Sequence, residues 1–326
     1  MRAQRLLDRA RAIGAAPGAR RALHLAQAGL FAAVVFLLIV QLSQAGWGAV
    51  FSSLPETPWF YLIFALRYFL QPLSEIPAYG LAWRTPLWRH WTAFIRKRVY
   101  NFAVMGYSGE AFFTLWARRT LGLSDRAVLT GVKDNTLISA FVSNTVTAAT
   151  IAALYAFSDF DREVSAIPGG RALFALAFLS AAGLAIAGAV FRRKLIGMAP
   201  AVMRRVIAIN AARIVLALFL QAMLYAAVIP EAPLSAWTAF IALQLVVSRL
   251  PLLPNKDIVF LTAALTLVPE VGAPEAAIAG MLLAEAGLSQ LFNLALFAAT
   301  AHHAVRRPDR GERTPAAAER ADSPSP

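Results

Sequence analysis

Residues 206–229 read VIAINAARIVLALFLQAMLYAAVI, an apolar run whose strongly polar members are Asn210, Arg213 and Gln221. An α-helix rises about 1.5 Å per residue, so a run of this length reaches across the roughly 30 Å hydrocarbon core of a bilayer. The run lacks the strict alternation of a half-buried strand. It therefore predicts a membrane-spanning helix that carries three polar side chains.

Other parts of the chain show the same kind of apolar run. The chain has 326 residues, of which 59% are hydrophobic, whereas soluble domains have about 45–50% apolar residues. The further runs are Leu23–Gln44, Pro58–Trp83, Ala127–Phe157 and Ala172–Phe191, a shorter one at Leu234–Leu250, and a last helix at Pro274–Ala301. We expect an all-α, polytopic transmembrane helix bundle of about six to eight spans, forming one domain over residues 23–305.

Two regions interrupt this regular pattern. Arg98–Leu123 mixes apolar and charged residues, and Pro251–Pro274 has an apolar core too short to span a bilayer. Both suit broken or re-entrant helices, which persist at membrane depth only where protein or a wet cavity covers them. Each region has an acid, a half-helix, a turn and then a long helix. This likeness fits an internal repeat of the kind found in transporters, and it also fits chance.

The charges indicate the orientation. The net charge is +13, from 31 Lys and Arg against 18 Asp and Glu, and most basic residues flank the apolar runs. Basic connections at 84–98 and 192–205 lie opposite connections that contain acids, so the positive-inside rule places them and the basic N-terminal segment 1–22 in the cytoplasm. We expect a multi-pass protein of a bacterial inner membrane, with anionic lipids rather than nucleic acid as partners. The tail, residues 306–326, has a disordered composition.

Several apolar runs contain charged or polar side chains at helical spacing. A charge at membrane depth costs about 2.5–3.5 kcal/mol on insertion scales, so such groups need partners or water. Arg67, Gln71 and Glu75 share one helical face, and we expect Pro72 to interrupt their helix. Hydroxyl and amide stripes follow in the later runs, where interhelical hydrogen bonding is the alternative to a functional role. Arginine in a span instead marks a cavity or pathway, although Arg249 lies where it can also snorkel to the interface.

Motifs for several kinds of chemistry are missing. The chain has no cysteine, no GxxxxGK[ST] loop and no HExxH, so we expect no cofactor and no metal site. Gly106-Tyr107-Ser108-Gly109 matches the GxSG motif of rhomboid proteases, but the histidines at 302 and 303 lack the small-residue helix context of that family. We therefore expect a protein that is not an enzyme.

Two segments resemble the transmembrane, flippase-like family of lysylphosphatidylglycerol synthases. The first is GYSGEAFFTLWARRTLGLSDRAVLTGVKDNTLISAF, in which Gly109-Glu110 leads a short helix with Arg118 and a long helix carries Lys133 and Asp134. The second is LPLLPNKDIVFLTAALTLVPEVGAPEAAIAGMLLAEAG, which contains Asp257 and Glu285. The soluble aminoacyl-transfer domain of the full synthases has no counterpart here. The resemblance implies a membrane domain that binds or moves an amphipathic lipid.

These observations together predict a protein that binds or translocates a phospholipid or lipid-linked precursor with an anionic headgroup. The expected substrate-binding residues are polar groups within the spans and the two irregular regions: Arg67, Gln71, Glu75, Glu110, Arg118, Lys133, Asp134, Arg213, Arg249, Asp257 and Glu285. Two alternatives stay open. One is an accessory or scaffold subunit that works with envelope-biosynthesis proteins in a lipid or glycan pathway. The other is an intramembrane lipid-modifying enzyme.

Overall fold

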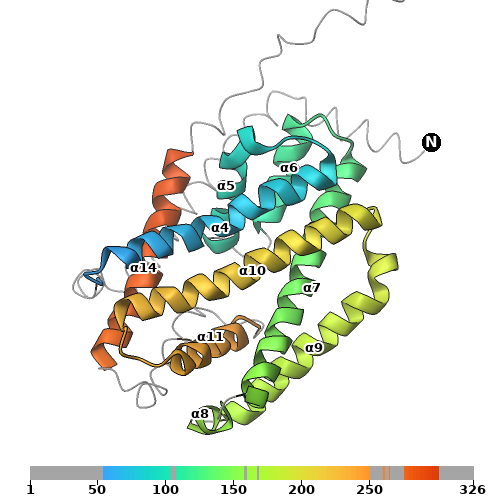
Figure 1. Ribbon diagram of the computed structural model, residues 1–326. Helices are drawn as coiled ribbons and strands as arrows, with labels where there is room; N and C mark the ends of the chain where they lie inside the picture. Colours follow the sequence, from blue (N-terminus) through green and yellow to red (C-terminus); the bar gives the residue numbers. More distant parts are fainter. Residues whose placement is uncertain are drawn as a thin grey trace, which may run out of the picture.

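A computed structural model describes residues 54–103, 108–157, 160–166, 169–249 and 275–300, together with residues 260 and 264. The secondary structure of these ranges is helical (Figure 1). The elements are α4 (Pro58–Trp83), a 3-10 turn η1 (Trp88–His90), α5 (Trp91–Ala103), α6 (Ser108–Thr120), α7 (Asp125–Phe157), α8 (Phe160–Ala166), α9 (Gly170–Leu195), α10 (Pro200–Val228), α11 (Leu234–Arg249) and α14 (Glu275–Ala299).

The helix boundaries follow local signals in the sequence. Proline stands in the first turn of α4 and of α10, where its missing N–H costs nothing. Helix α4 ends at Trp83. Its C-cap, Arg84, adopts the left-handed conformation with a φ of 53° and donates its backbone N–H to the Gly80 carbonyl oxygen. The expected interruption at Pro72 is wrong, because α4 runs unbroken through Pro72 and Pro77. Packing against neighbouring helices outweighs the loss of two backbone hydrogen bonds.

Four of the described helices are long and apolar enough to cross a membrane: Asp125–Phe157, Gly170–Leu195, Pro200–Val228 and Ala277–Ala299. The segment Ala236–Ser248 in α11 is apolar but shorter. Helix α4 is as long as α9, but it contains Arg67, Gln71 and Glu75 in its middle, and it is not among the four. These findings confirm the helical, membrane-type architecture. The count of six to eight spans stays a prediction.

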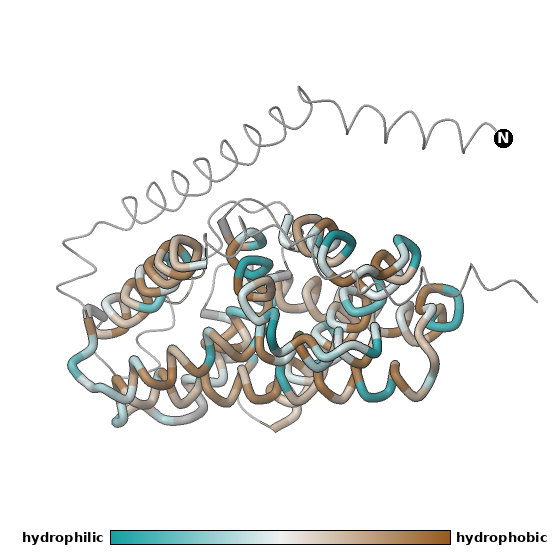
Figure 2. The backbone as a smooth tube through the Cα atoms, turned by 90° about the horizontal axis from the view of Figure 1, so that it is seen from above, coloured by the Kyte–Doolittle hydropathy of each residue, from teal (hydrophilic) through white to brown (hydrophobic). Residues whose placement is uncertain are grey.

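Helix α9 presents apolar side chains outward. Leu176, Leu179, Leu184, Ile186 and Val190 are each 60–67% exposed. Figure 2 shows that hydrophobic residues dominate the long helices and that hydrophilic turns also occur within the bundle. An exposed leucine and isoleucine surface of this extent suits acyl chains rather than water. On its other face α9 packs closely on α7, where a Cβ added to Gly188 would lie 2.6 Å from the Phe141 ring.

Two helix pairs organise the bundle. Helices α4 and α10 lie side by side and antiparallel, because Phe60 and Phe64 pack near Leu224 while Ala78 packs near Val206 (Figure 1). Helices α7 and α9 form the second pair. Helix α14 packs on α5, and α11 joins α10 and α7. Residues from different pairs therefore meet along the middle of α4.

The first irregular region forms two short helices, α5 and α6, which pack against each other. They meet at Gly109, where a Cβ would lie 2.0 Å from the Lys97 carbonyl oxygen, so only glycine fits. The Gly109 N–H donates to Asn101 Oδ1 at 2.7 Å and fixes the crossing. The other expected features lie outside the described residues: the run Leu23–Gln44, the N-terminal segment 1–22, the tail 306–326, and nearly all of Pro251–Pro274 with its proposed repeat.

Candidate functional site

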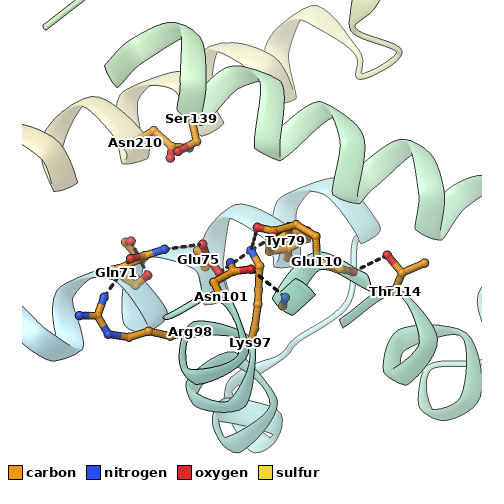
Figure 3. Close-up of polar contacts among 12 residues, drawn as sticks. Gln71, Glu75, Tyr79, Lys97, Arg98, Asn101, Glu110, Thr114, Ser139 and Asn210 are labelled. Carbon is orange, nitrogen blue, oxygen red and sulfur yellow. Dashed lines mark hydrogen bonds and ion pairs between the residues drawn. The ribbon is translucent and has the colours of Figure 1, made fainter. Parts of the chain in front are cut away.

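Polar side chains of α4, α10, α14 and the α5–α6 pair gather beside the middle of α4. Figure 3 shows those of α4, α5 and α6. We call this group the charged cluster. It consists of Arg67, Gln71 and Glu75 on α4, Lys97 and Arg98 on α5, Glu110 on α6, Arg213 and Gln221 on α10, and Glu285 on α14.

Lys97 joins two carboxylates. Its side chain is 2% exposed, and its Nζ lies 2.8 Å from Glu75 Oε2 and 3.4 Å from Glu110 Oε1. The ammonium also donates to the Tyr79 hydroxyl at 3.3 Å and lies 5.0 Å from the centre of the Tyr79 ring and 5.6 Å from that of Phe113. A buried ammonium is tolerated only with such partners. Lys97 therefore ties α5 to both α4 and α6.

Glu285 joins three helices at the other side of the cluster. Arg67 forms an ion pair with Glu285 Oε1, and Gln221 Nε2 donates to Glu285 Oε2 at 3.1 Å. Tyr68, which follows Arg67 in the sequence, donates its hydroxyl to Asn293 Oδ1 at 2.5 Å. These contacts link α4, α10 and α14 through polar groups rather than through apolar packing alone.

Two guanidinium groups of the cluster have no carboxylate at ion-pair distance among the described residues. Arg98 donates to Gln71 Oε1 at 2.9 Å and lies 4.2 Å above the Tyr68 ring. Arg213 donates to Ser139 Oγ at 3.0 Å and to Asn210 Oδ1 at 3.3 Å. The Nε atoms of both are buried and make no hydrogen bond in the described part of the chain.

The guanidinium groups also act on one another. Arg213 interacts with Glu75, which attracts it, and more weakly with Arg98, which repels it; Arg98 in turn is repelled by Arg67 and attracted by Glu75. Like charges held this close in a partly buried site repel each other. The cluster contains four cations, Arg67, Lys97, Arg98 and Arg213, and its carboxylates are those at 75, 110 and 285. It thus has one formal positive charge in excess, and Arg98 is close enough to interact with both Arg67 and Arg213.

The cluster lies at the depth of the membrane-spanning part of α10. Arg213 and Gln221 are eight residues apart in the printed sequence, which corresponds to about 12 Å along a helix. They lie on either side of the middle of Val206–Ile229, the run that predicted the span. Because α4 is antiparallel to α10, Arg67 falls near Gln221 while Glu75 falls near Arg213. The charges are therefore inside the bundle rather than at its ends.

Six of the predicted residues belong to this cluster: Arg67, Gln71, Glu75, Glu110, Arg213 and Glu285. Sequence reasoning missed Lys97 and Arg98, because the run Arg96-Lys97-Arg98 was assigned to a cytoplasmic connection. The structure places Arg96 and Lys97 within helix α5, where they are 6% and 2% exposed, rather than in an exposed connection. The side of the membrane stays a prediction. The overlooked signal was the apolar spacing of Phe94, Ile95 and Val99, which indicates a helix buried on several sides.

Other predicted residues lie elsewhere. Arg118 is exposed and forms an ion pair with Asp125 at the start of α7. Asp134 is fully buried, and its Oδ2 accepts hydrogen bonds from the N–H groups of Gly197 and Met198, both at 2.8 Å. Lys133 donates to the Leu195 carbonyl oxygen at 2.6 Å. Lys133 and Asp134 thus hold the α9–α10 connection against α7, so in this structure both groups have structural partners.

Two predicted residues are not placed by the structure. Arg249 is the last residue of α11, and its side chain lies outside the described atoms, as does all of Asp257.

Ser108, the serine of the GxSG motif, has a structural role in this fold. Ser108 Oγ donates to the Tyr100 carbonyl oxygen at 2.6 Å, which helps to anchor the start of α6 on α5. Many hydroxyls of the long helices bond within their own helix, as Thr145 does to Phe141 and Thr147 to Ser143. In the described ranges no group of three or more His, Cys, Asp or Glu side chains is placed to hold a metal ion.

Comparison of the chain with protein-family models, curated proteins and solved structures gives no match.

Proposed function

We propose that this chain is an integral membrane protein that binds an amphiphile with an anionic headgroup and moves it between the leaflets of a bacterial inner membrane. The observation that carries the proposal is a row of three guanidinium groups inside a membrane-type bundle, in which Arg98 interacts with both Arg67 and Arg213. Arg98 and Arg213 have no carboxylate at ion-pair distance among the described residues, and the cluster has one cation in excess. A phosphate or carboxylate head would supply the missing negative charge.

The chemistry of the three groups fits that ligand. A guanidinium has five N–H donors in a planar fork that matches a phosphate or carboxylate. In Arg98 and Arg213 the Nε donors are unused among the described atoms, and each side chain is held in place by an amide or hydroxyl oxygen rather than by a carboxylate. An entering anion would relieve the repulsion between the guanidinium groups without first breaking an ion pair.

The carboxylates have a different role in this proposal. Glu75 and Glu110 neutralise Lys97, and Glu285 neutralises Arg67, so they fix the helices around the binding position. The acyl chains of the amphiphile would remain in the bilayer beside the bundle. The resemblance to the flippase-like membrane domain of lysylphosphatidylglycerol synthases supports the same ligand class, and it depends on the quoted segments alone.

The test uses the full chain reconstituted in liposomes with trace fluorescent phosphatidylglycerol or phosphatidylcholine. Dithionite bleaching of the outer leaflet measures translocation, and mass spectrometry of the purified protein identifies bound lipid. We expect the anionic lipid to be moved, and the variants Arg98→Gln and Arg213→Gln to lose most of that rate. Arg171→Gln is the control, because Arg171 is an exposed arginine paired with Asp161 at the start of α9.

Absence of both translocation and co-purified anionic lipid would overturn the proposal. Equal rates in the cluster variants and in Arg171→Gln would show that lipid moves by another route through the protein.

A further inference from the structure

A second polar feature lies apart from the charged cluster, at the end of the bundle where α4 finishes and α7 and α10 begin. A cavity of about 380 Å³ opens there. We call it the Arg84 pocket. Its lining comes from the end of α4 (Leu81, Ala82, Arg84), the start of α7 (Ser124, Arg126, Ala127, Thr130, Gly131) and the α9–α10 connection with the start of α10 (Gly197, Met198, Ala199, Val202).

The charged side chains that line the pocket are both cationic, Arg84 and Arg126. Among the described residues neither guanidinium has an ion-pair partner. The nearest acid in the sequence, Asp125, is paired with Arg118. Asp134 is buried behind the lining, where its carboxylate is paired with Lys133 and accepts hydrogen bonds from two backbone N–H groups. The pocket therefore has a positive charge that no described acidic group neutralises.

Further donors line the same cavity. The Ser124 Oγ accepts a hydrogen bond from the Ala127 N–H at 3.3 Å, which leaves its own hydrogen available to a ligand. Thr130 adds a second hydroxyl. Helix α10 begins at the pocket wall with Ala199 as its N-cap, which provides no side-chain hydrogen bond to the first turn. The positive end of the α10 dipole thus adds to the field of the two arginines.

Arg84 has a strained backbone conformation at this position. Arg84 is the one non-glycine residue with a positive φ among those that the structure describes. A left-handed conformation is strained at such a residue, and asparagine or glycine would adopt it more easily. The chain nevertheless has an arginine there, at the rim of a cavity that contains a second arginine.

We propose that the Arg84 pocket binds a phosphoryl group, held between Arg84 and Arg126 with Ser124 and Thr130 as further donors. Two guanidinium groups and two hydroxyls match the oxygens of a phosphate better than they match a carboxylate or a cation. This end of the bundle carries the basic connections, so the ligand is either the head of an anionic lipid or a soluble phosphate compound on the same side. The site is separate from the charged cluster and does not depend on the function proposed for it.

The test measures binding to the full chain in dodecyl maltoside, a detergent without phosphate, by isothermal titration calorimetry. Two probes separate the two sources: inorganic phosphate, and short-chain dihexanoyl phosphatidylglycerol. We expect at least one of them to bind, and Arg126→Gln to weaken that binding by about tenfold or more, the loss of a charge-assisted hydrogen bond. Arg84→Asn tests the other arginine with a residue that suits the left-handed turn. Arg119→Gln, which removes an exposed arginine outside the pocket, is the control.

Binding of phosphate indicates a soluble ligand, and binding of the lipid alone indicates a headgroup. Failure of both probes to bind would overturn the proposal, as would wild-type affinity in both pocket variants. Loss of binding in Arg213→Gln but not in Arg126→Gln would place the ligand in the charged cluster, and the pocket proposal would then be wrong.

Discussion

Lys97→Met is the most informative single change in the charged cluster. Coulomb's law at an effective dielectric of about 20 gives an attraction of about 6 kcal/mol for the 2.8 Å contact with Glu75 and about 5 kcal/mol for the 3.4 Å contact with Glu110, before desolvation. Desolvation of the 2% exposed ammonium cancels several kcal/mol of this sum. Methionine fills a similar volume but leaves two carboxylates without their cation. We expect the free energy of unfolding to fall by about 3–5 kcal/mol.

The assay is reversible unfolding of the purified protein in mixed micelles by added dodecyl sulfate, followed by circular dichroism. Lys194→Met is the matched control, because Lys194 is exposed in the last turn of α9 and its loss should change stability by less than about 0.5 kcal/mol. Adding Glu75→Gln and Glu110→Gln to Lys97→Met removes the orphaned charges and should restore about 2 kcal/mol or more. If Lys97→Met unfolds like Lys194→Met, Lys97 does not join the two carboxylates and the description of the cluster fails.

Two further changes test the contacts that hold the cluster's surroundings in place, and both use the same unfolding assay. Gly109→Ala should lower the free energy of unfolding by about 1–3 kcal/mol, because its Cβ would lie 2.0 Å from the Lys97 carbonyl oxygen. Gly183→Ala is the control and should be neutral or stabilising, because nothing lies within 4 Å of its added Cβ. Equal effects of the two changes would contradict the close crossing of α5 and α6. Asp134→Ala should lower the free energy of unfolding by about 2–4 kcal/mol, because two N–H groups of the α9–α10 connection lose their acceptor. The same change should speed proteolysis at residues 195–199. Unchanged stability and cleavage would refute this role of Asp134.

The helices could be predicted from the sequence because their signal is local. An apolar run needs only its own residues to indicate a span, and the observed α7, α9, α10 and α14 begin or end within a few residues of the predicted runs. The grouping of Arg67, Glu75, Arg213 and Glu285 was also predictable in outline. Polar side chains in several spans avoid acyl chains best by facing one another.

The details of the cluster depend on contacts distant in sequence, which no local pattern contains. Lys97 was assigned to a loop because three consecutive basic residues fit the positive-inside rule. The structure instead shows three different inward contacts: Lys97 donates to Glu75, Arg98 donates to Gln71, and Arg96 donates to the Thr300 carbonyl oxygen. Adjacent residues on a helix point in directions about 100° apart, so a basic triplet need not share one environment.

Asp134 shows the converse case. Its place in a spanning helix predicted a ligand-binding role, since a buried acid at membrane depth requires a partner. That partner is the backbone of the α9–α10 connection, a segment more than 60 residues away whose path over α7 is set by tertiary packing. The sequence shows which side chains need partners, but a structure is needed to identify those partners.

Stability alone gives a weak reason for the charged cluster. Replacing a buried ion pair by apolar residues of similar volume is often neutral or stabilising, so ionic groups are an inefficient means of joining helices. Away from the Lys133–Leu195 hydrogen bond at the end of α9, α7 packs on α9 through apolar contacts, with Gly188 against Phe141 and with Ala177 and Ala181 buried. Apolar packing of helices is therefore also available to this chain. An excess cation where apolar packing would serve therefore favours a ligand that needs the charge.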